Sequence, residues 1–100
     1  MLVVTRFIVP ETDAPSFAER AQRAIAALSA RPGFRSARVG QAPDDATRWV
    51  LVTEWDGVGA WRRALSNFDV RVEAVPLLAM AEDEPGAYEL VHTLDVSAAT

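Results

Sequence analysis

The sequence predicts an α+β fold, in which helices pack on one face of a four-stranded antiparallel sheet. Four segments have the composition or two-residue alternation of strands, and two have the apolar spacing of amphipathic helices. Their βαββαβ order usually forms a ferredoxin-like sheet. The 100 residues suffice for one such domain. We expect it to span residues 1–96, with residues 97–100 as a frayed tail.

The first strand and the first helix have clear signals. Residues 2–9 are apolar or β-branched apart from two polar residues, and a proline follows them. Asp13 is the expected N-cap of the helix, and a capping box at residues 16–19 is the alternative start. The Arg31-Pro32-Gly33 sequence ends the helix. Its buried stripe is expected to contain Phe17, Ala21, Ala24, Ile25 and Leu28.

Three further segments predict strands. Residues 34–41 alternate weakly and contain a glycine, which favours an edge strand. Residues 48–55 are rich in aliphatic residues and tryptophan and give the strongest strand signal in the chain. Residues 87–96 alternate two sets of side chains, one of which contains His92, so the last strand is expected there.

The second helical region lies between the third and fourth strands. Its apolar residues recur every three or four positions, as in one continuous helical stripe. Asn67 and Asp69 are expected to break it into a main helix at residues 58–66 and a short piece at residues 69–74. Pro76 disfavours helix at the residue before it, so the region beyond is expected to be irregular. The stripe consists of Val58, Trp61, Leu65, Phe68, Val72 and Val75.

Composition argues against several classes of function. The net charge is −4, which argues against a nucleic-acid-binding surface. The absence of cysteine excludes disulfides, thiolate metal sites and a cysteine nucleophile. A single histidine without a carboxylate cluster at ligand spacing predicts no metal site. No apolar run approaches about 20 residues, and the first strand does not resemble a signal peptide. We therefore expect a cytoplasmic protein without a membrane contact.

The first and third strands are apolar on both faces, which predicts a homodimer. In residues 2–9, one face carries Val3 and Phe7 and the other carries Val4 and Ile8. Two helices can cover only one face of the sheet. The second face would leave an apolar patch too large for a typical monomer. A second copy packed sheet to sheet is the simplest cover.

Several motifs carry a family resemblance. Pro32-Gly33-Phe34 opens the second strand, Val52-Thr53-Glu54-Trp55 closes the third, and a helix with an aromatic residue at Trp61 follows. Over roughly residues 2–94, the chain resembles the antibiotic biosynthesis monooxygenase family. The resemblance implies a dimeric α+β barrel with a pocket between helices and sheet in each subunit. Members that act as enzymes oxidise polycyclic phenols, anthrones or hydroquinones with O₂ and no metal or flavin, so no cofactor is expected.

The chain departs from two known branches of that family. The haem-degrading branch has an asparagine, a tryptophan and an axial histidine at positions that correspond here to Thr5, Ala64 and Ala74. Haem degradation is therefore disfavoured. The best-known phenol oxygenases carry an asparagine and a tryptophan four residues apart, and those positions fall near Ala60 and Ala64. The catalytic groups of neither branch carry over to this sequence.

His92 and Arg6 are the candidate polar groups for chemistry. His92 has the only side chain whose ordinary pKa lies near neutrality, so it is the candidate proton acceptor, with water as the alternative. The alternative is a purely structural role for His92, as a hydrogen-bonded histidine in the barrel interior or at the dimer interface. Arg6 could stabilise a phenolate, but a cross-strand pair with Glu54 is the favoured interpretation. The candidate substrate pocket consists of Thr5, Phe7, Trp61, Leu65 and Phe68.

Two functions stay open from the sequence. The first is a cofactor-independent monooxygenase-like protein that oxidises a small aromatic, phenolic or quinol substrate with O₂. The second is a dimeric barrel that binds a small apolar ligand and catalyses nothing. Both require an apolar cavity, and only the first requires a proton acceptor and stabilisation of an anion.

Overall fold

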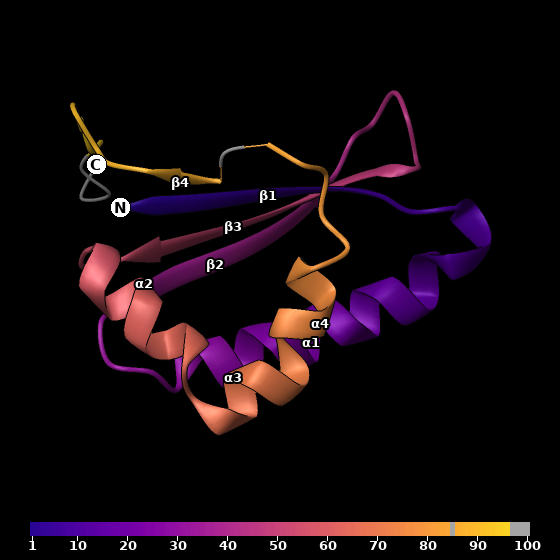
Figure 1. Cartoon of the computed structure of the whole chain (residues 1–100). Coiled ribbons are helices and arrows are strands. Elements are labelled where there is room, and N and C mark those ends of the chain that lie inside the picture. The colour runs from indigo at the N-terminus through magenta and orange to yellow at the C-terminus, as the bar shows by residue number, and fades with distance from the viewer. Residues whose placement is uncertain (85, 97–100) are drawn as a thin grey trace.

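The computed structural model describes residues 1–84 and 86–96, and these form a sheet covered on one face by helices (Figure 1). The strand order is β2-β3-β1-β4 and every pairing is antiparallel, so the predicted α+β ferredoxin-like fold is confirmed. The strands are β1 (Leu2–Ile8), β2 (Phe34–Gln41), β3 (Arg48–Trp55) and β4 (Ala87–Tyr88). The helices are η1 (Glu11–Asp13, 3₁₀), α1 (Ala14–Ser29), α2 (Val58–Leu65), α3 (Phe68–Glu73) and α4 (Val75–Leu78). Within this part of the chain, no helix has the length and apolarity needed to span a bilayer.

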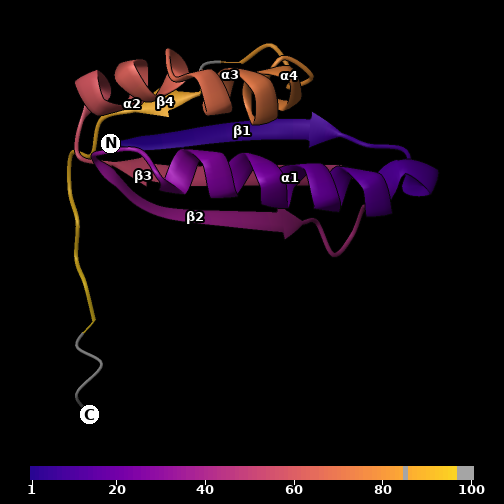
Figure 2. The same cartoon turned by 90° about the horizontal axis from the view of Figure 1, so that it is seen from below.

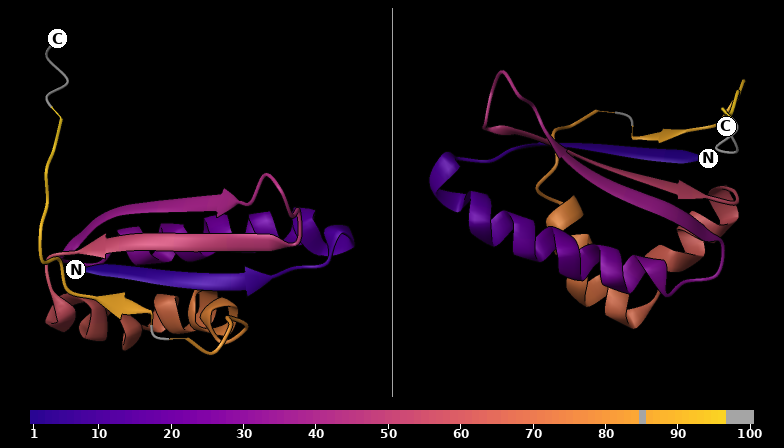
Figure 3. Two further views of the ribbon diagram at one scale, coloured as in Figure 1. Left: turned by 90° about the horizontal axis from the view of Figure 1, so that it is seen from above. Right: turned by 180° about the vertical axis from the view of Figure 1, so that it is seen from behind.

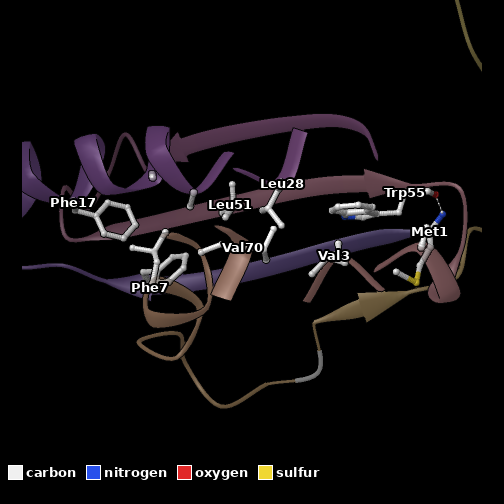
Figure 4. Close-up of a cluster of buried hydrophobic side chains, with 14 of the residues drawn as sticks. Met1, Val3, Phe7, Phe17, Leu28, Leu51, Trp55 and Val70 are labelled. Atoms are coloured by element: carbon white, nitrogen blue, oxygen red, sulfur yellow. Dashed lines mark hydrogen bonds between the residues drawn. The ribbon is translucent and has the colours of Figure 1, made fainter. Parts of the chain in front are cut away.

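The core lies between the sheet and the helices. Phe7 and Leu51 of the two central strands, Leu28 of α1 and Val70 of α3 are at most 2% exposed and meet in this layer (Figure 4). Trp55 is fully buried, and its indole N–H donates to Thr53 Oγ1 at 2.9 Å. Because a buried polar group is costly without a partner, this bond lets a tryptophan and a threonine share an apolar layer.

The second face of the sheet carries no helix (Figure 3). Register places Val4 opposite Val52, and both are half-buried in the single chain. Ile8 on the same face is 56% exposed. The expectation that the central strands are apolar on both faces is therefore confirmed. The homodimer that would cover the second face stays a prediction.

The last strand is shorter than the sequence predicted. We expected it at residues 87–96, but β4 contains only Ala87 and Tyr88. Register explains the difference, because Tyr88 lies opposite Leu2 and any later residue runs past the beginning of β1. Residues 89–96 are exposed and extend away from the body of the domain (Figure 2). The expected tail at residues 97–100 lies outside the described residues.

Helix ends follow the sequence signals in part. The predicted break is confirmed, since Asn67 caps α3 by accepting a hydrogen bond from the Val70 N–H at 3.3 Å. Asp13 is the N-cap residue of α1, although its side chain makes no cap hydrogen bond. The expectation that helix ends before Pro76 is wrong, because α4 contains that proline in its first turn, and the irregular region begins at residue 79 rather than 77. A proline there loses no helical hydrogen bond, since the first N–H groups of a helix have no acceptor within it.

Candidate functional site

A hollow of about 460 Å³ lies at the β4 side of β1, between α2, α4 and the segment that leads to β4. Its lining is apolar on the helix side and charged at the segment. The apolar side consists of Val4, Trp61, Leu78, Ala79 and Ala81. Thr5, Arg6, Glu82, Asp83, Glu84 and Gly86 complete the lining. The hollow thus offers an apolar wall with charged groups at one side, as small-molecule sites commonly do.

The hollow exists because β4 pairs with only the beginning of β1. Beyond Val3, the edge of β1 is bordered by residues 82–84 and by Gly86. The Val4 N–H donates to the Gly86 carbonyl at 2.6 Å, and the Glu82 N–H donates to the Arg6 carbonyl at 2.8 Å. Gly86 fits this approach because a Cβ there would lie 3.1 Å from the Val4 carbonyl oxygen. These two bonds hold residues 82–84, which we name the acidic strap, along the strand edge.

Ion pairs attach the acidic strap to the sheet. Arg6 Nη1 lies 3.1 Å from Glu84 Oε2, and Arg48 Nη1 lies 3.3 Å from Glu82 Oε1. Side chains of both pairs are about a third to a half exposed. Exposed pairs contribute at most about 1 kcal/mol. They therefore orient the strap but leave its charges free to exchange partners.

The predicted pair between Arg6 and Glu54 is wrong. Register places Glu54 opposite Leu2, four residues from Arg6 along β1. Glu54 instead lies 3.8 Å from Arg35 Nε, on the neighbouring strand β2. Arg6 thus keeps its place at the hollow, where it is the one cationic side chain among the described residues of the lining.

Trp61 forms the aromatic part of the wall. It lies on α2 and is half-buried, and its ring centroid is 5.4 Å from that of the fully buried Trp55. This packing fixes the Trp61 ring from behind. A large fixed aromatic surface beside a hollow suits an aromatic ligand, because offset or edge-to-face ring contacts add to apolar burial.

The structure brings only part of the predicted pocket together. Thr5 and Trp61 line the same hollow. Phe7 is 1% exposed and belongs to the core, and Leu65 packs against that core. Phe68, at the beginning of α3, is 76% exposed. None of these three residues lines the hollow. Of the stripe predicted for the second helical region, all of which is described, Trp61 alone lines it.

His92 lies apart from Thr5 and Trp61 within the single chain. It is exposed on the segment that follows β4 and lines a different, open hollow with Leu2, Arg35 and Glu54. Its assignment as proton acceptor stays a prediction. The sequence placed it in the sheet because residues 87–96 alternate, and alternation does not reveal that β1 has no residues left to pair with them.

The acidic strap is the part of the hollow that sequence reasoning missed. Residues 82–84 are three consecutive acidic residues in the region that the sequence predicts to be irregular, where such a charge run usually indicates a solvated loop. Arg6, a charge inside an otherwise apolar strand, was the signal that a counter-charge lay nearby. Among residues 1–84 and 86–96, no three His, Asp or Glu side chains gather in a way that could hold a metal ion.

The antiparallel sheet with its helices and the hollow at its edge define an α+β domain of the ferredoxin-like class. The family model described as antibiotic biosynthesis monooxygenase matches residues 1–72, so the chain belongs to this family. No curated protein sequence matches the chain.

Solved structures give the same fold. A single-residue mutant of SnoaB from Streptomyces nogalater, described as a cofactor-independent oxygenase, is 28% identical with a TM-score of 0.80. The alignment covers 93% of this chain and 94% of that one. A second SnoaB structure is 25% identical with a TM-score of 0.76 and the same coverage. A conserved protein of Methanosarcina mazei is 17% identical, with a TM-score of 0.70 over 86% of this chain and 84% of that one. This last likeness shows the fold alone.

Proposed function

We propose that this protein is a cofactor-independent monooxygenase-like enzyme that oxidises a small aromatic, phenolic or quinol substrate with O₂. Membership of the family and the likeness to SnoaB support the reaction class. The observation that carries the proposal is the hollow itself, because it joins Trp61, Thr5 and Arg6 at one place. An aromatic ring would pack against Trp61, and its oxygen would face the charged side.

The proposed chemistry asks little of the protein besides binding and charge stabilisation. Loss of a proton from an electron-rich phenol or anthrone gives an anion that O₂ can oxidise. For an anthrone, the CH₂ carbon becomes a carbonyl carbon, one oxygen atom of O₂ becomes the carbonyl oxygen, and the other leaves as water with the two hydrogens. All four electrons that O₂ accepts in this step come from the substrate, so no further reductant is needed. The chain must exclude bulk water and stabilise the anion, a task that suits Arg6.

The proton acceptor in this proposal is His92 or a water molecule. Within one chain His92 is exposed outside the hollow. A role for it therefore requires a second copy that brings residues 89–96 to the hollow, whereas water requires none. His92→Ala separates the two cases, because turnover falls only if the imidazole accepts the proton.

We also propose that two copies pack through the open face of the sheet. The uncovered face is apolar at its centre, where Val4 and Val52 lie opposite each other. The segment 89–96 is exposed and includes Val91 at 97% and Leu94 at 84%. A second copy would cover the face, and these apolar side chains would gain a contact surface.

Ligand binding without catalysis is the second candidate function. It is favoured by Ala60 and Ala64, which are 5% and 2% exposed and lie near the positions that the family resemblance gives to the asparagine and tryptophan pair. Neither side chain can hydrogen-bond a substrate. In this case the hollow would hold an aromatic or apolar molecule unchanged.

Oxygen uptake distinguishes the two candidates. Purified protein is mixed with an anthrone or a hydroquinone in an oxygen electrode, and the product is identified by mass spectrometry. The first candidate predicts catalysed O₂ uptake above the spontaneous rate, with one oxygen atom from ¹⁸O₂ incorporated into an anthrone product. Saturable ligand binding without catalysed uptake would support the second.

A further inference from the structure

A third hollow lies where the turn between α1 and β2 meets α2. Gly33 in the turn has a φ of +87°, a conformation that favours glycine. A Cβ at Gly33 would lie 2.4 Å from the Cβ of Ala60. The turn therefore packs directly on α2, and this contact fixes the positions of the residues on either side.

The close approach places two arginines around one small hollow. Its volume is about 130 Å³ and its lining consists of Arg31, Pro32, Arg63 and Ala64. Arg63 extends back along α2, since its Nη1 would lie 3.1 Å from a Cβ at Gly59. The two arginines thus come from different elements, Arg31 from the turn after α1 and Arg63 from α2.

The charge at this hollow is unbalanced. No carboxylate lines it, and among the described residues neither Arg31 nor Arg63 forms an ion pair. Arg6, Arg35 and Arg48, by contrast, each have a carboxylate within 4.0 Å. Arg31 Nε is also buried without a hydrogen-bond partner. A buried donor without an acceptor is uncommon and costs stability.

We propose that this hollow binds a small oxyanion, of the size of phosphate or a single carboxylate group, between Arg31 and Arg63. Guanidinium groups recognise such oxygens through parallel charge-assisted hydrogen bonds. A volume of about 130 Å³ corresponds to roughly four water molecules at about 30 Å³ each. That space suits one oxyanion group and is too small for an aromatic ring with substituents. The site is separate from the hollow beside Trp61.

A purely structural role for Arg31 makes a different prediction. Arg31 follows the end of α1, where a cation stabilises the helix dipole without any bound anion. That role needs no contribution from Arg63, which lies on another helix. The two interpretations are distinguished by the response of Arg63 variants to anions.

The test is a titration of the full chain with inorganic phosphate and, separately, with sodium acetate. Ionic strength is held constant with sodium chloride, and binding is measured by calorimetry and by the rise in Tm. Arg63→Gln is compared with Arg62→Gln, a neighbouring exposed arginine that does not line the hollow. We expect saturable binding that is weakened about tenfold or more by Arg63→Gln and unchanged by Arg62→Gln. Stronger binding of phosphate or of acetate identifies the preferred anion.

Two results would overturn the proposal: no saturable response to either anion, or equal responses of the two variants. Arg31→Gln is a less decisive variant, because the side chain is part-buried and its loss could lower stability. Arg63 is exposed, so Arg63→Gln keeps the test independent of folding. Neither outcome bears on oxidation at the Trp61 hollow, since the readout is anion binding alone.

Discussion

Arg6 of β1 and Glu84 of the acidic strap form an ion pair with an Nη1–Oε2 distance of 3.1 Å, although 78 residues separate them in sequence. Their side chains are 46% and 51% exposed. The pair therefore contributes at most about 1 kcal/mol to stability. An arginine held this weakly at the edge of a hollow can exchange its carboxylate partner for the oxygen of a bound phenolate.

Arg6→Gln tests that exchange. The substitution removes the cation from the hollow, so we expect KM for a phenolic substrate to rise about tenfold, because a charge-assisted hydrogen bond is lost. The free energy of unfolding should change by less than about 1 kcal/mol. Steady-state kinetics and urea denaturation measure the two effects. Arg62→Gln, an exposed arginine of α2 outside the hollow, is the control and should alter neither. Unchanged KM in Arg6→Gln would remove Arg6 from the binding site.

Gly33→Ala tests the contact between the α1–β2 turn and α2. The new Cβ would be strained at a φ of +87° and would meet the Ala60 Cβ at 2.4 Å. We expect a loss of about 2–4 kcal/mol in the free energy of unfolding. Gly57→Ala is the matched control, since nothing lies within 4 Å of a Cβ there and its φ is −178°. Its effect should stay within about 0.5 kcal/mol. Equal losses in both variants would contradict the close packing.

Val52→Asp tests the proposed dimer. Val52 lies on the open face of the sheet opposite Val4, so a carboxylate there would be buried between two copies. Light scattering coupled to size exclusion should show a dimer for the unaltered chain and a monomer with native circular dichroism for the variant. Val72→Asp, on α3 and 51% exposed, should stay dimeric. A monomer at all concentrations of the unaltered chain would refute sheet-to-sheet pairing.

Thr47→Val tests the pH dependence of the connection between β2 and β3. The Thr47 hydroxyl donates to Asp45 Oδ1 at 2.6 Å and its N–H donates to the same oxygen at 3.0 Å, and these bonds lower the pKa of Asp45 below 3.8. A lowered pKa in the folded state stabilises the fold above the unfolded pKa, and that contribution is lost as pH falls through the folded value. NMR titration should show the Asp45 pKa closer to 3.8 in Thr47→Val and unchanged in Thr12→Val. An unaltered pKa in Thr47→Val would mean that the hydroxyl does not bind the carboxylate.

The sequence was informative wherever local periodicity decides structure. It predicted the fold, the central strands and the break capped by Asn67, because apolar spacing and capping are local properties. It made the last strand too long, because the length of that strand depends on how many residues of β1 are left to pair with it, and the alternation around His92 carries no such information. Arg6 showed that a charge needed a partner, but only the three-dimensional course of residues 82–84 identified Glu84.

The candidate site was predicted in part for the same reason. Thr5 and Trp61 belong to regular elements whose inward faces can be read from their spacing. Phe7 shares the inward face of β1 with Thr5 but lies deeper in the core, where it is 1% exposed. Phe68 continues the stripe of Trp61 in sequence, yet the break at Asn67 begins a new helix and turns that side chain toward solvent. The spacing of apolar residues in the sequence does not reveal that the helix axis changes direction between α2 and α3.

The central claim is that substrate oxidation takes place in the hollow beside Trp61. The most direct measurement is kcat/KM for O₂-dependent oxidation of an anthrone by Trp61→Leu and by Trp49→Leu. Trp49 is also half-buried, and its ring centroid lies 5.3 Å from that of Phe17, but it does not line the hollow. We predict a loss of about tenfold or more in Trp61→Leu, from the removed ring contact, and a much smaller change in Trp49→Leu. Equal kcat/KM in Trp61→Leu and the unaltered protein would contradict the assignment of this hollow as the active site.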